Sequence, residues 1–564
     1  MDDALWVLSP SRDEARTIAS ELGIPLPIAQ VLVNRKILDA PAARRFLQGT
    51  MDDFNDPFLF SGMKAAVARI EAAIARGEKI LIFGDYDVDG ILSMVMLHKA
   101  LTTLGGRVDY FIPERLKDGY GIKDEHVAVA AERGARLVIS VDCGIKAGGF
   151  VRLAAEAGVD VIVTDHHLPG SELPAAAALL DPVVEGSGYP EKNLAGVGVV
   201  FKLIQALFGK TRRAGSLRHY LKLVALGTIS DIAELRGENR LFVKHGLKEL
   251  ENVANPGLRS LFDVCGLLGR KISEGDVGFR IGPRINAAGR MGETDLAVRL
   301  FFATSDRETM DIARRLDALN GRRQLAEEKI FRQAADRVRA NRHDAKYKIL
   351  ILGCEEWQRG VIGIVASRLK DAFRRPVVLF SYEDGRAYGS GRSIGEFSLI
   401  ACLEESGGRF LSYGGHTYAV GCTLMREDLS DFRRGANAVA EARLTDEDLR
   451  KTLRLDAEVE FADIGQRGFL DAYALLSPFG VGNARPIFVS RQAEVAAAPQ
   501  TMQGKHLKLQ LRQNGRAFEA VGWDRAAWAG RIGQGDRIDV AYSLLFSSYL
   551  GEDKLQLSLE GARR

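Results

Sequence analysis

Three short apolar runs in the first third of the chain each end at acidic or imidazole side chains. The runs occupy residues 79–84, 137–141 and 159–164 and consist mainly of Val, Ile and Leu. Continuous apolar runs of this length, separated by helical stretches, predict buried parallel strands, and such sheets bind ligands beyond the carboxyl ends of their strands. We therefore expect one crevice to collect the side chains that follow the runs, which are Asp85, Asp87, Asp89, Asp142, Asp165, His166 and His167.

So many carboxylates can share a small volume only if cations neutralise them. Oxygen and imidazole donors without a thiolate favour Mn²⁺, with Mg²⁺ as the alternative, over structural zinc. Asp231, which follows the apolar run 221–229, is a further candidate ligand, although by itself it would indicate a helix cap or a turn. The set suits two ions about 4 Å apart with a bridging carboxylate and an activated water, which predicts hydrolysis of phosphoester or phosphoanhydride bonds.

Taken alone, the acidic triplet of residues 85–89 would be interpreted as a solvated turn. Acidic triplets are common in solvated turns, so the triplet becomes informative only together with the histidines of the third run. An EF-hand loop is excluded because the distal glutamate that such a loop requires does not follow.

The composition restricts the class of protein but does not identify its function. The 564 residues predict two to four domains, and a formal net charge of +3 indicates no overall affinity for polyanions. The five cysteines are scattered and never spaced as CxxC, which fits a reducing cytoplasm. We see no signal peptide and no apolar stretch long enough to span a membrane, so we expect a cytoplasmic protein.

The pattern along the chain predicts five parts. Residues 280–290 are rich in glycine and are expected to interrupt a helical region, and Gly321 is expected to interrupt a long solvated helical stretch. Near the end, alternating stretches that begin at Leu453, Pro486, His506, Phe518, Arg537 and Lys554 predict a small antiparallel barrel. A five-stranded nucleic-acid-binding barrel would fit, and other small β folds stay open. The expected parts are a helical extension (1–75), a doubly wound parallel-sheet α/β domain (76–303), a connecting helix (304–343), a smaller α/β domain (344–450) and the barrel (451–564).

The metal motifs resemble those of the DHH phosphoesterase superfamily, and the match continues beyond them. Segments 111–121, 230–234, 283–290, 319–324, 360–368, 389–393 and 414–416 are similar, in order, to motifs of its single-strand-specific 5′→3′ exonucleases. The resemblance covers essentially the whole chain and implies a DHH domain, a DHH-associated domain and a C-terminal OB-fold. One departure is Gln358, where the family pattern has histidine; it concerns a local contact in the second domain rather than the metal centre.

The resemblance also implies roles for particular residues. The divalent-metal ligands would be Asp85, Asp87, Asp89, Asp142, His166 and Asp231. Asp165 would orient a ligand from behind, and His167 would contact the scissile phosphate or stabilise the transition state. In this family the two α/β domains clasp a narrow channel, whose DNA- and phosphate-binding residues would be Arg115, Tyr120, Arg284, Arg290, Ser390, Gly391, Arg392 and His416.

Physical reasoning agrees with these phosphate-binding residues. Arginines beside glycines offer bidentate donors where a phosphate can approach the backbone closely. Without the resemblance, any one of these arginines would as readily form a surface salt bridge, and His416 could be structural. A channel wide enough for one strand would exclude duplex DNA, and stacking on Tyr120 would tolerate any base. In the barrel, Lys505, His506 and Lys508 are the candidates for holding the strand.

The function expected from the resemblance is release of mononucleotides from the 5′ end of single-stranded DNA in recombination and repair. Two divalent ions, preferably Mn²⁺, would serve as cofactors, and a helicase and a single-strand-binding protein are candidate partners of a monomeric enzyme. A DHH phosphodiesterase for short oligonucleotides or cyclic dinucleotides, or a related pyrophosphatase, would not need the barrel. A catalytically inactive DNA-binding scaffold would be expected to lack ligands that this chain retains.

Overall fold

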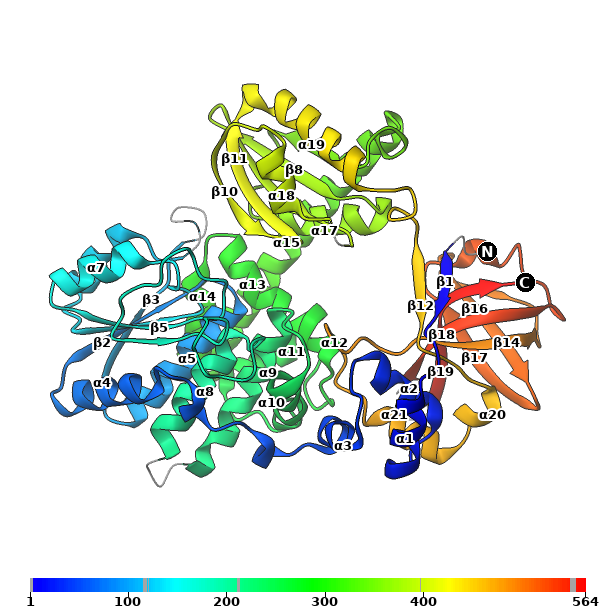
Figure 1. The fold of residues 1–564 in the computed structure, drawn as a ribbon, viewed down its shortest axis with the longest axis horizontal. Helices are drawn as coiled ribbons and strands as arrows, with labels where there is room; N and C mark the ends of the chain where they lie inside the picture. Colours follow the sequence, from blue (N-terminus) through cyan, green and yellow to red (C-terminus); the bar gives the residue numbers. More distant parts are fainter. Residues whose placement is uncertain (1–3, 115–118, 120, 210–213, 396, 548–553) are drawn as a thin grey trace. The chain divides into compact units, whose positions relative to one another are not determined.

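The computed structural model describes residues 4–114, 119, 121–209, 214–395, 397–547 and 554–564 (Figure 1). The chain divides into two compact units, one of Met1–Asn286, Ala297–Ala313 and Thr452–Arg564, the other of Ala287–Leu296 and Arg314–Lys451. Within the described residues, no helix has both the length and the apolar character needed to cross a membrane. The predicted binding residues Arg115 and Tyr120 lie outside the described residues.

The three apolar runs form neighbouring strands of a five-stranded parallel sheet. The spatial order is β3-β2-β4-β5-β6, so the chain starts in the middle, adds a strand on one side and then continues on the other. In a doubly wound sheet of this order, the crevice opens where the direction of winding reverses, here between β2 and β4. The strands are β2 (Lys79–Gly84), β3 (Arg107–Phe111), β4 (Leu137–Val141), β5 (Asp160–Thr164) and β6 (Ala178–Leu180).

Helices cover both faces of this sheet, which explains why its central strands are apolar on both sides. On one face, Phe83, Val138 and Val161 pack with Phe150 of α7 (Gly148–Glu156). On the other, α5 (Val88–Thr103) packs on β2 and β3, and α4 (Met63–Ala75) packs on β6. Each buried aliphatic side chain contributes about 1.5–3 kcal/mol of hydrophobic stabilisation.

A helical region follows the sheet, and one of our expectations for it was wrong. The glycine-rich segment does not interrupt the helices, because it forms η5 (Val277–Ile281), a π-helical turn, and α13 (Gly282–Arg290). Gly282 serves close packing, since a Cβ there would lie 2.6 Å from the Ser230 hydroxyl oxygen. The other helices of the region are α8 (Gly196–Gly209), α9 (Leu221–Ser230), α10 (Gly237–Glu249), α11 (Pro256–Val264) and α14 (Thr294–Phe302).

The expected break at Gly321 was also wrong. Residues Asp306–Ala340 form one continuous helix, α15. Apart from the chain neighbours and the adjacent backbone of the helix itself, no atom of the described residues lies within 4 Å of where a Cβ of Gly321 would stand. A mid-helix glycine costs only about 1 kcal/mol relative to alanine, and strong helix formers such as Arg, Gln, Ala and Glu flank it. Buried Leu316 and Leu319 anchor the preceding turns.

The second unit contains a mixed five-stranded sheet with helices on both faces. The order is β10-β11-β9-β8-β7, in which only β7 and β8 run parallel. Val377 and Leu379 face α17 (Ile362–Phe373), whereas Val378 and Phe380 face α18 (Leu399–Glu405) and α19 (Leu429–Arg443). The strands are β7 (Leu350–Cys354), β8 (Val377–Glu383), β9 (Arg386–Arg392), β10 (Phe410–His416) and β11 (Ala419–Met425).

The C-terminal strands close into a barrel with the connectivity of an OB-fold. Going round the barrel the order is β14-β18-β19-β17-β16, and β16 pairs again with β14, so five strands complete the ring. Closure removes the exposed strand edges that would invite aggregation. The strands are β14 (Phe488–Val495), β16 (His506–Gln513), β17 (Arg516–Gly522), β18 (Arg537–Ser547) and β19 (Lys554–Arg563), and the short β13 (Ala457–Glu458) and β15 (Gln500–Met502) extend the sheet.

The stretch at Leu453, expected in the barrel, pairs elsewhere. It forms β12 (Thr452–Leu455), which runs parallel to β1 (Leu5–Leu8), so the first part of the chain is not wholly helical (Figure 1). The helices that follow β1 share one apolar core with the barrel, in which Ile18, Val31 and Phe46 lie together with barrel residues. These helices are α1 (Asp13–Leu22), α2 (Leu26–Asn34) and α3 (Ala40–Gln48).

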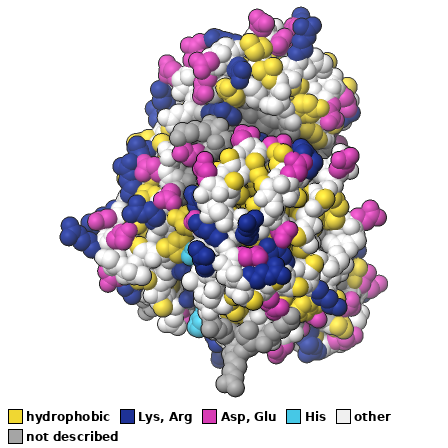
Figure 2. Space-filling view, turned by 90° about the vertical axis from the view of Figure 1, so that its left-hand side faces the viewer, with side chains coloured by type: hydrophobic (Ala, Val, Ile, Leu, Met, Phe, Trp, Pro, Cys, Tyr) yellow, Lys and Arg dark blue, Asp and Glu magenta, His cyan; other side chains and the backbone are white. Residues whose placement is uncertain are grey.

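Surface charge is mixed on the face that Figure 2 shows. Lys and Arg side chains alternate there with Asp and Glu, and apolar side chains lie between them. This agrees with the small net charge of the chain, so binding of a polyanion must depend on local groups.

Candidate metal centre

The loop after β2 places three aspartates at the opening of the crevice. Asp87 is the N-cap of α5, and its side chain accepts the backbone N–H of Gly90 at 3.1 Å. A Cβ on Gly90 would lie 2.6 Å from the carbonyl oxygen of Asp85, so this tight turn requires glycine. The spacing Asp-x-Asp-x-Asp-Gly is therefore a structural unit that joins strand to helix.

Asp89 is buried in the first turn of α5 and is 1% exposed. Its carboxylate accepts the backbone N–H groups of Gly196 and Val197, at 2.7 and 2.8 Å, at the start of α8. The first turn of α8 thus donates its backbone N–H groups to a protein carboxylate. A helix N-terminus stabilises negative charge, so α8 holds Asp89 in place.

Asp142 follows β4 in a strained conformation. Its φ of +60° lies in the left-handed region, which costs a non-glycine residue about 1 kcal/mol or more. A Cβ on Gly196 would lie 2.8 Å from the Asp142 carboxylate oxygen Oδ1, so α8 also approaches this ligand closely. The strain turns the carboxylate toward the crevice.

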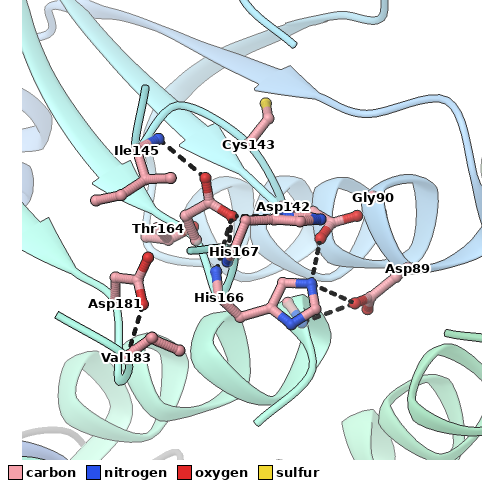
Figure 3. A network of polar contacts seen from close by, with 12 residues as sticks. Asp89, Gly90, Asp142, Cys143, Ile145, Thr164, His166, His167, Asp181 and Val183 are labelled. Atoms are coloured by element: carbon pink, nitrogen blue, oxygen red, sulfur yellow. Dashed lines mark hydrogen bonds and ion pairs between the residues drawn. The ribbon is translucent and has the colours of Figure 1, made fainter. Parts of the chain in front are cut away.

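The histidines after β5 have different surroundings (Figure 3). His166 Nε2 lies 3.0 Å from Asp142 Oδ1 and 3.9 Å from Asp89 Oδ2. Asp165 Oδ1 lies 2.7 Å from His167 Nδ1, and Asp165 Oδ2 accepts the N–H of Ile145 at 2.9 Å. The His167 ring, 39% exposed, is thus held from behind by Asp165.

The donor set fits divalent cations. Three overlapping triplets have ligand atoms within 4.8 Å of one another, and His166 and Asp142 each belong to two of them. Asp231, at the end of α9, completes one triplet. Cys143 is no ligand here, since its buried thiol has a raised pKa and points to the carbonyl oxygen of Val141. The triplets are Asp85/Asp87/Asp142, Asp89/His166/Asp231 and Asp142/His166/His167.

The electrostatics of the crevice show why a cation is needed. Burial raises the pKa of Asp89 to about 6, and burial together with neighbouring carboxylates raises the pKa of Asp142 and Asp231 well above the usual value. Burial alone would lower the pKa of His166, but Asp142 outweighs it and the pKa rises. A metal ion would supply positive charge that favours the ionised form of these carboxylates.

Two residues near the centre were missed by the sequence analysis. Asn286 Oδ1 accepts the backbone N–H of Val88 at 3.2 Å, so α13 supports the aspartate loop from 198 positions away. Asp181, fully buried after β6, has a pKa raised by burial to about 6. Asp181 follows the end of a strand, as the other acids do, so the sequence pattern could have identified it as a candidate. The contact of Asn286 depends on tertiary structure and has no such signal.

The expected phosphate-binding residues divide among several elements. Arg284 donates to the carbonyl oxygen of Arg280 at 2.7 Å, and Arg290 donates to that of Gly360 at 3.2 Å. Both side chains are half-buried on α13. Nothing in these contacts assigns either arginine to a ligand.

Ser390, Arg392 and His416 share one face of the second sheet. Ser390 and Arg392 alternate on β9, and Ala419 of β11 lies between Arg392 and His416 in the strand register. A Cβ on Gly363 would lie 2.9 Å from Ser390 Oγ and 3.4 Å from Arg392 Nη2, so both side chains meet the first turn of α17.

Two other positions of this unit are now placed. Gly391 faces the opposite side, where a Cβ would lie 2.7 Å from Val420 Cγ2, so its missing side chain serves core packing. Gln358, which replaces the family histidine, is exposed just before α17, and its carbonyl oxygen accepts the N–H of Val361.

Models of three domain families match the chain. The DHH family N-terminal domain matches residues 79–228, the DHHA1 domain matches 346–442 and the RecJ OB domain matches 455–561. These ranges include the parallel sheet with its acidic crevice, the mixed sheet and the closed barrel.

Relatives extend over almost the whole chain. The single-stranded-DNA-specific exonuclease RecJ of Bacillus subtilis (strain 168) is 37% identical over 557 residues, which cover 98% of this chain and 70% of that protein. The enzyme of the same name from Escherichia coli (strain K12) is 32% identical over 578 residues, with 97% of each chain covered. The crystal structure of RecJ in complex with Mn²⁺ from Thermus thermophilus has a TM-score of 0.84 at 30% identity and covers 100% of this chain and 80% of that one.

Proposed function

This chain belongs to the RecJ family of single-stranded-DNA-specific exonucleases, and from that premise we propose that it degrades single-stranded DNA from the 5′ end to mononucleotides. The reaction is metal-dependent hydrolysis of phosphodiester bonds, and its role is in recombination and repair. The observation that carries the proposal is the convergence of five aspartates and His166 at the switch point of the parallel sheet.

We assign two divalent ions to the crevice, with Mn²⁺ preferred over Mg²⁺. Their ligands are Asp85, Asp87, Asp89, Asp142, His166 and Asp231. These form the triplets Asp85/Asp87/Asp142 and Asp89/His166/Asp231, which the triplet Asp142/His166/His167 connects. When bound, the ions supply a nucleophile at neutral pH and stabilise negative charge on phosphate oxygens. A relative from Thermus thermophilus has been solved with Mn²⁺ and also with Mg²⁺, which supports the choice of these two metals.

The protein groups have distinct tasks in this proposal. Asp165 accepts from His167 Nδ1 and so fixes the orientation of the imidazole. His167 then contacts the scissile phosphate or stabilises the transition state, in which negative charge grows on the phosphate oxygens. The lowered pKa of Asp165, which burial opposes and the His167 hydrogen bond produces, keeps this acceptor ionised.

The strand is held by groups outside the crevice. We propose DNA and phosphate contacts for Arg115, Tyr120, Arg284, Arg290, Ser390, Arg392 and His416, with the backbone of Gly391 beside them. Arg392 and His416 lie on one face of the second sheet, which supports a shared task. Guanidinium groups suit this purpose because their donors match phosphate oxygens in pairs.

The setting of the activity follows from the substrate. We propose that the enzyme acts as a monomer in the cytoplasm and receives single strands from a helicase or a single-strand-binding protein. The five free cysteines fit a reducing compartment. We further propose domain boundaries at residues 76–303, 304–343, 344–450 and 451–564, supported by the family matches.

A time course with Mn²⁺ on single-stranded DNA, labelled in parallel at the 5′ or the 3′ end, tests the proposal. We expect immediate release of a labelled mononucleotide from the 5′ end and progressive shortening of the 3′-labelled strand. Duplex DNA and a chelator are the controls. Hydrolysis confined to dinucleotides would move the chain to the small-substrate phosphodiesterases, and strand binding without hydrolysis would favour a scaffold.

A further inference from the structure

Trp523 stands apart from the other three tryptophans of the chain. Trp357 and Trp528 are 1% and 7% exposed, and Trp6 is half-buried with the guanidinium of Arg563 lying 4.4 Å from its ring centroid. Trp523 is 52% exposed. A large aromatic ring left in water forgoes hydrophobic burial, so its position calls for a reason.

The position of Trp523 in the barrel supplies that reason. It follows the last residue of β17, whose Gly522 pairs with Leu507 of β16, and precedes η7 (Ala526–Trp528). Next to it, β15, which lies in the β14–β16 connection, pairs Met502 with His506. OB-folds hold oligonucleotides on the face of their second and third strands and on loops that include the connection between the first and second strands. Here these are β16, β17 and the β14–β16 connection, which lies beside Trp523.

Local contacts fix the indole in place. The imidazole of His506 packs edge-on against Trp523, with ring centroids 4.9 Å apart and an angle of 72°. The backbone N–H of Asp524 donates to His506 Nδ1 at 3.0 Å, so the neutral imidazole carries its proton on Nε2. Asp524 has a φ of +54°, a left-handed conformation that turns the chain sharply after the indole.

Charges around the indole are asymmetric. Lys505 is exposed, and its carbonyl oxygen accepts the N–H of Ala526 at 3.0 Å, which places it beside η7. Asp524 is the acid that faces His506, 3.7 Å from Nδ1, with its side chain 83% exposed to solvent. Lys508, by contrast, is engaged by Glu519 at 2.7 Å. Lys505 is thus better placed than Lys508 to meet a phosphate.

We propose that Trp523, supported by His506, is a base-stacking platform for single-stranded DNA on the barrel, and that Lys505 neutralises an adjacent phosphate. The inference rests on the proposed function, because it names the barrel residues that hold the strand being degraded. Stacking on an indole accepts every base, as an exonuclease that digests any sequence requires.

Intrinsic fluorescence tests the platform directly, since Trp523 is the most exposed tryptophan. Oligo(dT) is titrated into the full chain with Mn²⁺, in a His167→Ala background so that the strand is not consumed. We expect quenching of the emission, retained in Trp528→Phe and lost in Trp523→Phe. Unchanged emission at DNA concentrations that saturate binding by anisotropy, or undiminished quenching in Trp523→Phe, would overturn the proposal.

Affinity then separates stacking from charge. We expect Trp523→Ala to weaken binding of a strand of about 40 nucleotides roughly tenfold, with Trp523→Phe close to the parent. Lys505→Met should lower the slope of log affinity against log salt by about 0.7, whereas Trp523→Ala should leave the slope unchanged. Equal affinity of Trp523→Ala and its parent would also overturn the proposal.

Point variants are used because deleting the barrel would expose the apolar faces of α1 and α2. The outcome is distinguishable from failure of the proposed function. A chain that binds and is quenched but never hydrolyses DNA would contradict the nuclease assignment and leave the platform standing. Normal hydrolysis of DNA without quenching would support the nuclease assignment and contradict the platform.

Discussion

The metal crevice and the outer surface of the barrel differ in the burial of their functional side chains, because one is proposed to cleave a bond and the other to hold a strand. In the crevice, Asp89 and Asp142 are almost fully buried among other acids, and the like charges are compatible only with a cation. On the barrel, Trp523 is half exposed beside an exposed lysine, Lys505. Bond cleavage requires donors at fixed positions, whereas holding a strand of any sequence requires an open ring that any base can use.

Asp142→Ala should give the largest difference between the effect on hydrolysis, which depends on the crevice, and the effect on DNA affinity, which depends on the barrel. Loss of a ligand shared by two triplets removes several kcal/mol of transition-state stabilisation, so we expect a fall of about a thousandfold or more in the rate of hydrolysis. Affinity for single-stranded DNA, measured by anisotropy, should change less than about threefold. A large loss of affinity would mean that crevice and barrel do not act separately.

Asp165→Asn tests whether the acid behind His167 matters as an acceptor. An amide can replace only one of the two carboxylate oxygens that accept from Ile145 and His167, so the imidazole loses its fixed orientation. Single-turnover hydrolysis should fall about 10–100-fold with Mn²⁺ binding retained. Asp160→Asn, at the exposed other end of β5, is the matched control and should stay within about twofold.

Asp142→Gly should make the metal-free protein more stable while abolishing hydrolysis. Glycine adopts the positive φ without strain, and the variant removes a buried carboxyl group whose pKa is raised by burial and by its neighbours. With a chelator present, chemical denaturation should give a free energy of unfolding about 1–2 kcal/mol higher than that of the parent. A less stable variant would show that Asp142 is needed by the fold as well as by the chemistry.

Lys508→Met should have the smallest effect, although its sequence position made it a candidate for DNA binding. Its ammonium group already lies 2.7 Å from Glu519, which also lies 3.6 Å from Lys554. Affinity for single-stranded DNA should change less than about twofold, as is usual for partly exposed ion pairs. A loss matching that of Lys505→Met would show that Glu519 releases Lys508 to the strand.

The sequence was most informative where local chemistry and strand position coincide. Apolar runs predicted β2, β4 and β5, and the acids after them do lie in one crevice because parallel strands end at a common edge. The expected helix breaks at segment 280–290 and at Gly321 were wrong, since glycine in a helix can serve close packing, as at Gly282, or simply be tolerated.

What the sequence did not reveal depends on contacts between distant segments. The hydrogen bond from Val88 to Asn286 joins positions that no local pattern relates, and the pairing of β1 with β12 joins segments far apart in the chain. Trp523 carried no signal in the sequence, because its exposure becomes visible only when β16 and β17 are paired.

The shared core of the N-terminal helices and the barrel has a consequence for synthesis. Residues 13–48 leave the ribosome first, yet the apolar groups that cover Ile18 and Val31 come after residue 452. At about 5–20 residues per second, roughly 20–80 seconds pass before they can be covered. During that interval α1 and α2 carry an apolar surface that a chaperone could shield, and a slowed ribosome in the intervening region would prolong their exposure.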